Sequence, residues 1–128
     1  MVMGQPGQLE EWRQLDQAVA SSLVEVECFR TLDRFRLREQ IQPADLTARY
    51  EAMHRLVERL RLIELDTRVL RRAAQPLPVP LTTLDAIHLA TAMLWMEADG
   101  VPGILATHDA ALGRAGRAVG FRVLGVLT

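Results

Sequence analysis

Short apolar stretches alternate with longer stretches of helical periodicity along this chain, and this alternation limits its possible folds more than any other feature. The strand-like stretches occupy residues 19–21, 62–65, 104–106 and 121–126. Between them, apolar residues recur every three to four positions, as they do in amphipathic helices. Strands that alternate with helices are typical of α/β domains, because each helix returns the chain to the start of the next parallel strand. We therefore predict an α/β fold with a mainly parallel sheet.

The first half of the chain contains recognisable helix starts. Ser22 and Glu25 match a capping box, in which the two side chains bind free amides of the first turn, and predict a helix from residue 23. Pro43 is tolerated in a first turn and predicts the start of a second helix. Shorter helices are expected over residues 9–15 and 67–74. The expected apolar faces of the two long helices comprise Leu23, Val26, Phe29, Leu32, Leu46, Tyr50, Met53, Val57 and Leu60.

The second half begins after a proline-rich connector. Three prolines at alternate positions within residues 75–80 exclude a helix there and predict an extended segment. A helix with Asp85 in its first turn is expected next, ending at Gly100, and Asp109 is expected to cap a further helix. Neither half is large enough to bury a core by itself. We therefore predict a single domain over residues 1–128.

Composition excludes several classes of protein. The 15 basic and 16 acidic residues give a formal charge of −1, which argues against a general coat for nucleic acids but allows a local basic patch. The single cysteine, Cys28, excludes a disulfide framework and a cysteine-based zinc site, and it suits a reducing cytoplasm. No apolar run has the length of a membrane span, and residues 1–7 lack the apolar core of a signal peptide. We expect a small cytoplasmic protein that does not act at a membrane.

Three acidic residues fall where parallel α/β sheets place their active sites, near the carboxyl ends of strands and the first turns of the helices that follow. They are Glu27, Asp85 and Asp109. Each has a plain alternative role, because the helix dipole stabilises acids in first turns without any further function. The capping box explains Glu25 but leaves Glu27 unexplained. Asp85 lies within an apolar stretch, where a single charge needs a reason.

Three carboxylates at one sheet edge repel one another unless a cation lies between them. Oxygen ligands suit Mg²⁺ or Mn²⁺, and such an ion activates water and stabilises charge on a scissile phosphodiester. We therefore predict that Glu27, Asp85 and Asp109 are both metal ligands and catalytic residues. The sequence contains no P-loop, GxSxG or GxGxxG motif, so nucleotide hydrolysis, serine hydrolysis and dinucleotide binding have no support.

The three histidines have different expected roles. His88 lies one turn after Asp85 on roughly the same helix face and could approach the site, although a packed histidine is the commoner case. His108 stands beside Asp109 and is a candidate for substrate contact, whereas His54 is expected to face solvent. Three scattered histidines do not make a transition-metal site.

Four segments in chain order closely resemble PIN-domain proteins of the VapC toxin type. They are residues 21–27, 84–92, 106–109 and 118–121, and the resemblance runs from about Leu9 to the C-terminus. It implies a three-layer α/β/α sandwich and a magnesium-dependent endoribonuclease that acts as the toxin of a type II toxin–antitoxin pair. It further implies RNA as substrate, neutralisation by a small cognate antitoxin, and a homodimer formed through helices such as the one over residues 42–61.

The resemblance assigns the family's acids, residue by residue, to Glu27, Asp85 and Asp109. Thr107 matches the hydroxyl residue that precedes the last acid, and we take it as substrate-binding. The start of the chain departs from the family, which opens with a central strand that ends in an aspartate. The sequence of residues 1–7 does not predict such a strand, and Asp16 is expected to precede the second strand on the wrong side of the sheet. We therefore expect the first strand and its aspartate to be missing, with a gap in the sheet.

Two explanations of this departure stay open: N-terminal truncation of an active family member, or a degenerate member that binds metal weakly. For the chain as it stands we expect weak or absent nuclease activity, and exposed strand edges favour dimerisation or strand exchange.

Two alternative functions also stay open. One is a PIN-like module that binds RNA or a protein without chemistry, with a phosphate path along Arg30, Arg34, Arg36 and Arg38; the same run also fits a solvated face paired with Asp33 and Glu39. The other is an unrelated small α/β protein whose acids only cap helices.

Overall fold

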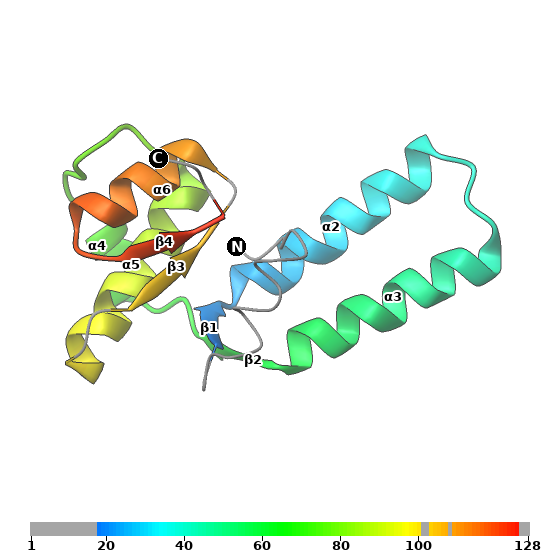
Figure 1. Cartoon of the computed structure of the whole chain (residues 1–128), viewed down its shortest axis with the longest axis horizontal. Coiled ribbons are helices and arrows are strands. Elements are labelled where there is room, and N and C mark those ends of the chain that lie inside the picture. Colours follow the sequence, from blue (N-terminus) through cyan, green and yellow to red (C-terminus); the bar gives the residue numbers. More distant parts are fainter. Residues whose placement is uncertain (1–17, 101–102, 108, 126–128) are drawn as a thin grey trace.

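The computed structural model describes residues 18–100, 103–107 and 109–125, and it confirms a mixed α/β fold with parallel strands (Figure 1). The expected helix over residues 9–15 lies outside the described residues. The elements in chain order are β1 (Ala18–Ser21), α2 (Leu23–Arg38), α3 (Pro43–Glu58), β2 (Leu60–Ile63), α4 (Thr67–Ala73), α5 (Thr83–Asp99), β3 (Ile104–Ala106), α6 (Ala110–Ala118) and β4 (Arg122–Leu124).

The strands form two parallel pairs. β1 pairs with β2, with Ala18 opposite Leu60, and β3 pairs with β4, with Ile104 opposite Arg122. Within the described ranges these pairs are two separate two-stranded sheets, and no strand joins β1 to β3. The described strands thus form two separate pairs, as the expected gap in the sheet implies. The absence of the family's first strand stays a prediction, because it concerns residues outside the described part of the chain.

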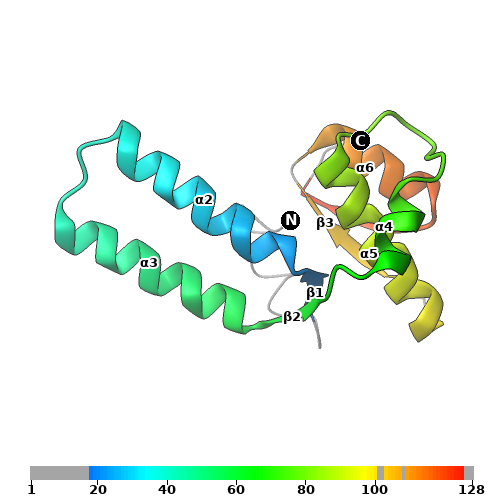
Figure 2. The same ribbon diagram turned by 180° about the vertical axis from the view of Figure 1, so that it is seen from behind.

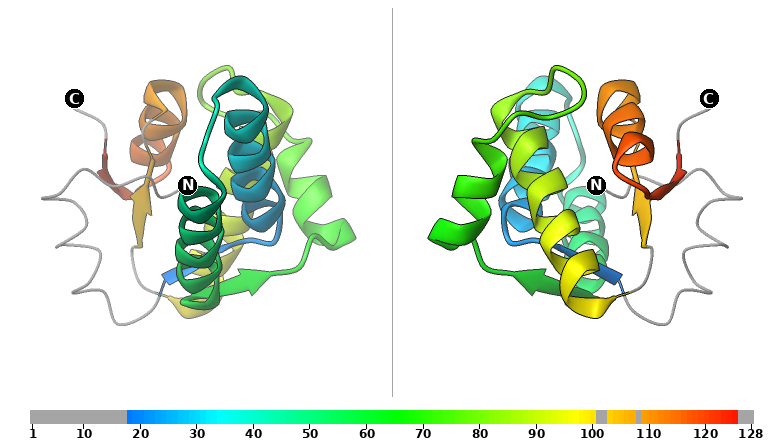
Figure 3. Two further views of the ribbon diagram at one scale, coloured as in Figure 1. Left: turned by 90° about the vertical axis from the view of Figure 1, so that its right-hand side faces the viewer. Right: turned by 90° about the vertical axis from the view of Figure 1, so that its left-hand side faces the viewer.

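Helix α5 lies between α4 and α6 (Figure 3). It contributes residues to two apolar clusters. One cluster contains the buried residues Leu89, Met93, Leu105, Leu112, Ala115 and Phe121. The other contains Val69, Ile87 and Ala90, so it joins α5 to α4. Because successive residues of α5 face different clusters, the helix is buried on most sides along its first half. This burial encloses the polar side chains of His88 and Thr91.

The ends of α5 follow the sequence prediction. The side chain of Thr82 accepts a hydrogen bond from the amide of Asp85, which satisfies one free donor of the first turn. Gly100 ends the helix with a φ of 78°, a left-handed conformation that glycine adopts without a steric cost. At the start of α6, the side chain of Asp109 accepts from the amide of Leu112, as predicted.

Two predictions for α2 are wrong. Ser22 makes no side-chain cap, because its φ of −58° and ψ of −18° are already helical, and the capping box needs an extended residue there. The hydroxyl of Ser21 instead accepts from the amide of Leu23. Val26, expected on the apolar face, is 57% exposed. The face that α2 buries runs through Val24, Cys28 and Leu32, which lie four residues apart.

Several boundaries also differ from the prediction. β2 begins at Leu60 and ends at Ile63, whereas the apolar run predicts a strand over residues 62–65. β4 is confined to Arg122–Leu124, within the predicted 121–126. Strand ends follow backbone pairing with a neighbour, which the apolar pattern of one segment does not encode. No helix in the described part of the chain is long and apolar enough to cross a membrane.

Helices α2 and α3 form an antiparallel pair, here called the arm, which extends away from the other helices (Figures 1 and 2). Its buried residues are Val24, Cys28 and Leu32 of α2 and Val57 of α3. The helices also meet through aromatic contacts: the centre of the Phe29 ring lies 6.1 Å from that of Tyr50 and 4.6 Å from that of His54. His54 is exposed, as predicted, although its ring contacts Phe29.

Candidate functional site

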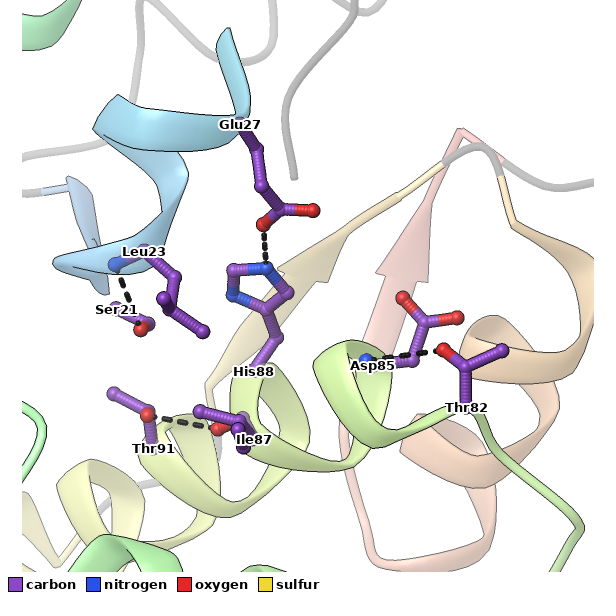
Figure 4. A network of polar contacts seen from close by, with 8 residues as sticks. All are labelled: Ser21, Leu23, Glu27, Thr82, Asp85, Ile87, His88 and Thr91. Atoms are coloured by element: carbon purple, nitrogen blue, oxygen red, sulfur yellow. Dashed lines mark hydrogen bonds and ion pairs between the residues drawn. The ribbon is translucent and has the colours of Figure 1, made fainter. Parts of the chain in front are cut away.

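A polar contact joins the base of the arm to α5. Glu27, in the second turn of α2, has a side chain that is 22% exposed, and His88 of α5 is only 8% exposed. Nε2 of His88 donates to Oε1 of Glu27, since a carboxylate only accepts (Figure 4). His88 is therefore a packed histidine that also approaches the predicted site. No functional role is assigned to His88 from sequence, and the signal that it could approach the site is its spacing of three residues from Asp85.

Asp85 lies in the first turn of α5 and is half-buried. Its amide donates to the Thr82 hydroxyl at 3.3 Å, which leaves the carboxylate outside the cap. Figure 4 shows the Asp85 carboxylate and the His88 ring on the same side of α5, as expected for helical residues three apart. Glu27 is thus bonded to the His88 ring, and Asp85 lies one turn before His88 on the same side of α5.

Asp109 and Thr107 form a turn after β3. The amide of Asp109 donates to the Thr107 hydroxyl at 3.0 Å, and Oδ1 of Asp109 accepts from the amide of Leu112 at 2.8 Å. Thr107 is buried, and its own amide donates to the carbonyl of Leu124 at 2.9 Å. Thr107 therefore holds the turn that presents Asp109 at the start of α6. His108, the predicted neighbour of this turn, lies outside the described residues.

The three predicted ligands have the chemistry for Mg²⁺ or Mn²⁺, because all of them are carboxylates. Across residues 18–100, 103–107 and 109–125, however, no three His, Cys, Asp or Glu side chains group closely enough to hold a metal ion. One oxygen of Glu27 bonds to His88, and one oxygen of Asp109 caps α6. Glu27, Asp85 and Asp109 therefore have oxygen atoms suited to such an ion, but they are not grouped around a single ion position.

Three arginines of α2, namely Arg30, Arg34 and Arg36, contact side chains of their own helix. Asp33 accepts from both Arg30, at 3.1 Å, and Arg36, with a closest separation of 2.9 Å. The Arg36 and Arg30 guanidinium groups hold the pKa of Asp33 below its ordinary value. Arg34 donates to the Thr31 hydroxyl. The predicted alternative of a solvated face paired with Asp33 is confirmed for Arg30 and Arg36.

Cys28 follows Glu27 and is buried, and both facts raise the pKa of its thiol: burial contributes most, and the adjacent carboxylate adds to it. A raised pKa leaves less of the reactive thiolate at about pH 8. We expect a disulfide reagent to modify Cys28 at least about tenfold more slowly in the native protein than in urea. Stopped-flow absorbance measures both rates directly. Equal rates in the two states would show that the thiol is exposed and unshifted.

Comparison with known families adds an independent observation. A model of the PIN domain matches residues 5–118, a range that contains Glu27, Asp85 and Asp109. Neither a curated protein nor a solved structure matches the chain. PIN domains are typically metal-dependent nucleases, and the family match agrees with the α/β fold and the parallel strands. Because the match covers most of the sequence, this chain belongs to the PIN domain family.

Proposed function

We propose that this protein is a metal-dependent endoribonuclease, the toxin of a type II toxin–antitoxin pair, with weak activity in this chain. The observation that carries the proposal is the position of Glu27 and Asp85. Glu27 of α2 bonds to the buried ring of His88 in α5, and the Asp85 carboxylate lies one turn before His88 on the same side of that helix. Partly buried acids are costly unless a cation or a donor compensates them, and such groups concentrate at functional sites.

Glu27, Asp85 and Asp109 are the proposed catalytic residues and ligands of Mg²⁺ or Mn²⁺. A bound ion would activate water and stabilise charge on the scissile phosphate. Asp85 stands at the N-terminal end of α5, and Asp109 stands at the N-terminal end of α6, where the turn at Thr107 orients it. Thr107 and Arg30 are the proposed substrate contacts, and Arg30 would have to exchange Asp33 for an RNA phosphate.

The proposed activity is weak because the described carboxylates do not close a three-ligand group. A site that must move its ligands together before it holds an ion binds that ion less tightly than a preformed site. This is also the observation that favours the second candidate, a PIN-like module that binds RNA or a protein partner without cleavage. The two candidates differ in whether a metal ion binds at the acids.

The proposed partners are RNA, a small cognate antitoxin and a second copy of the chain, in the cytoplasm. Helix α3 supports the homodimer. Only Val57 of this helix is buried, and its other large apolar side chains lie half-exposed along the arm: Leu46, Tyr50, Met53 and Leu56. Half-exposed apolar residues in a row on one helix favour a partner that covers them.

The test is a Mn²⁺ titration followed by electron paramagnetic resonance, with RNA cleavage measured in parallel. We expect Asp85→Asn to weaken both ion binding and cleavage by about tenfold or more, because the amide carries no charge. The matched control is Asp99→Asn, at the exposed far end of the same helix, which should leave both unchanged. A folded wild-type protein that neither binds Mn²⁺ nor cleaves RNA would instead support the binding module.

A further inference from the structure

The outer end of the arm carries a local excess of positive charge, on a chain whose formal charge is −1. We call residues 34–49 the arm tip. It comprises the last turns of α2, the connecting loop and the first turns of α3, and it lies far from the other helices (Figures 1 and 2). Its charged residues are the arginines Arg34, Arg36, Arg38 and Arg49 and the acids Glu39 and Asp45. The arm tip is therefore a local basic patch of the kind that the balanced composition allows.

Most of this positive charge has no carboxylate beside it. Arg36 is the exception, since it pairs with an acid of its own helix. Arg34 donates to the hydroxyl of Thr31, which is a neutral group. Among the described residues, no ion pair includes Arg34, Arg38 or Arg49. An anion that binds to these three arginines therefore displaces no carboxylate.

The three arginines gather around one aromatic ring. The guanidinium carbon of Arg49 lies 4.6 Å from the centre of the Phe35 ring, in a cation–π contact that crosses from α3 to α2. Arg38 follows Phe35 by three residues and Arg34 by four, and side chains at these spacings are neighbours on a helix surface. The Phe35 ring is half-buried. The arm tip thus combines a partly exposed aromatic ring with planar cations on two helices.

The helix dipole explains only part of this arrangement. Cations in the last turn of a helix are stabilised by its carbonyl end, which accounts for Arg36 and Arg38. Arg34 precedes that turn, and Arg49 lies in the first half of α3, away from a carbonyl end. Arg34 and Arg38 are also like charges four residues apart, a spacing at which they repel each other. A bound anion between them would relieve this repulsion.

We propose that the arm tip binds single-stranded RNA, with Arg34, Arg38 and Arg49 in contact with phosphates and Phe35 stacked on a base. Binding would move Arg49 from the ring to a phosphate and open that face of the ring. Arginine matches phosphate geometry, and stacking of bases on aromatic rings tolerates any sequence. The choice of RNA rests on the proposed function, whereas the surface itself needs no metal ion. Arg34 lies about 10 Å along α2 from Glu27, so a strand of several nucleotides is long enough to reach the candidate site.

The test is fluorescence anisotropy of a labelled single-stranded RNA in EDTA, which removes metal ions and metal-dependent cleavage. The triple variant Arg34→Gln, Arg38→Gln and Arg49→Gln should bind at least about tenfold more weakly than the wild type, because it loses three phosphate contacts. Affinity is also measured against salt concentration. On logarithmic axes the slope should become shallower by about 2, since each phosphate contact with a single strand contributes about 0.7.

A control variant removes the same amount of charge elsewhere. It carries glutamine at three other exposed arginines, namely Arg55, Arg68 and Arg71. Its affinity should stay within about threefold of the wild type, and its salt slope should not change, because these residues contact no phosphate in the proposal. Circular dichroism shows whether each variant is folded. A folded triple variant that loses no more affinity than this control overturns the inference.

Phe35→Leu tests the stacking without a change in charge. Leucine keeps an apolar side chain in the arm but has no flat ring, so the RNA affinity should fall about fivefold or more while the salt slope stays unchanged. A further measurement uses the wild-type protein alone. RNA that contains 4-thiouridine, crosslinked by light, should label peptides from residues 34–49, which mass spectrometry identifies. Labels confined to other parts of the chain would contradict the proposal.

An acidic protein segment is the competing ligand for such a patch. Unlabelled RNA should displace the probe at a concentration at least about tenfold lower than polyglutamate of the same charge, because glutamate has no base to stack. Equal displacement by the two competitors would reject RNA in favour of an acidic partner.

The results separate this inference from the proposed function. RNA that binds the arm tip in EDTA but is not cleaved when Mn²⁺ is added overturns the nuclease and supports the inference. Wild-type protein that cleaves RNA with Mn²⁺, together with a folded triple variant that binds RNA as tightly in EDTA, overturns the inference alone. Wild-type protein that neither binds RNA in EDTA nor cleaves it overturns both.

Discussion

Leu89→Ala should lower the free energy of unfolding by about 3–5 kcal/mol, the upper part of the range for a buried leucine. Leu89 is 0% exposed and packs in the cluster that joins α5 to β3 and α6. The truncation removes apolar surface from the core and leaves a cavity that rigid neighbours cannot fill. Urea unfolding followed by circular dichroism measures the change.

The control for this prediction is Leu70→Ala, a leucine of α4 that is 45% exposed. It makes the same chemical change where water already contacts the side chain, so we expect the free energy of unfolding to fall by only about 1 kcal/mol or less. Comparable losses for the two variants would show that α5 does not lie at the centre of the core. Because α5 also carries Asp85 and His88, the same result would weaken the basis for the site.

Gly125→Ala is the second substitution with a large expected effect. Gly125 has a φ of 103°, and a Cβ built there would lie 2.3 Å from the carbonyl oxygen of Thr107. The backbone must shift to relieve that contact, and the positive φ adds its own cost. We therefore expect the free energy of unfolding to fall by about 2–4 kcal/mol. Thr107 orients Asp109, so the proposed RNA cleavage should fall as well.

Gly120→Ala separates the two costs. Gly120 has nearly the same φ, 102°, but a Cβ placed there would meet no described atom within 4 Å. Its alanine variant should show only the conformational cost, about 1–2 kcal/mol. The difference between the two variants, measured by urea unfolding, is the cost of the contact with the Thr107 carbonyl. If the two losses are the same, that contact relaxes freely and the turn at Thr107 is not tightly held.

Local rules predicted the parts of the fold that depend on neighbouring residues. The start of α5 after Thr82, its end at Gly100 and the cap at Asp109 follow from hydrogen-bonding groups within one turn of the chain. The same rules failed at Ser22. Its backbone is already helical, so the capping geometry that the Ser-x-x-Glu pattern suggests does not form.

The candidate site was predictable as a set of residues but not as an arrangement. Two signals mark Glu27, Asp85 and Asp109 as candidate site residues. One is their position after strands or in first turns, and the other is the resemblance to PIN-domain proteins. The cap that Asp109 makes is local and could be predicted, whereas the bond between Glu27 and His88 could not. That bond depends on which helix faces which, and a contact across 61 residues of chain leaves no local pattern.

Adjacent residues are enough to predict the alternation of strands and helices, the ends of α5 and the family, because short-range hydrogen bonding and apolar periodicity act between near neighbours in the chain. Two features instead arise from tertiary packing: Val26 faces water, and Glu27 bonds to a buried histidine instead of a nearby arginine. Burial and strand pairing are properties of surfaces that folding brings together. The same residue is exposed or buried according to what packs against it.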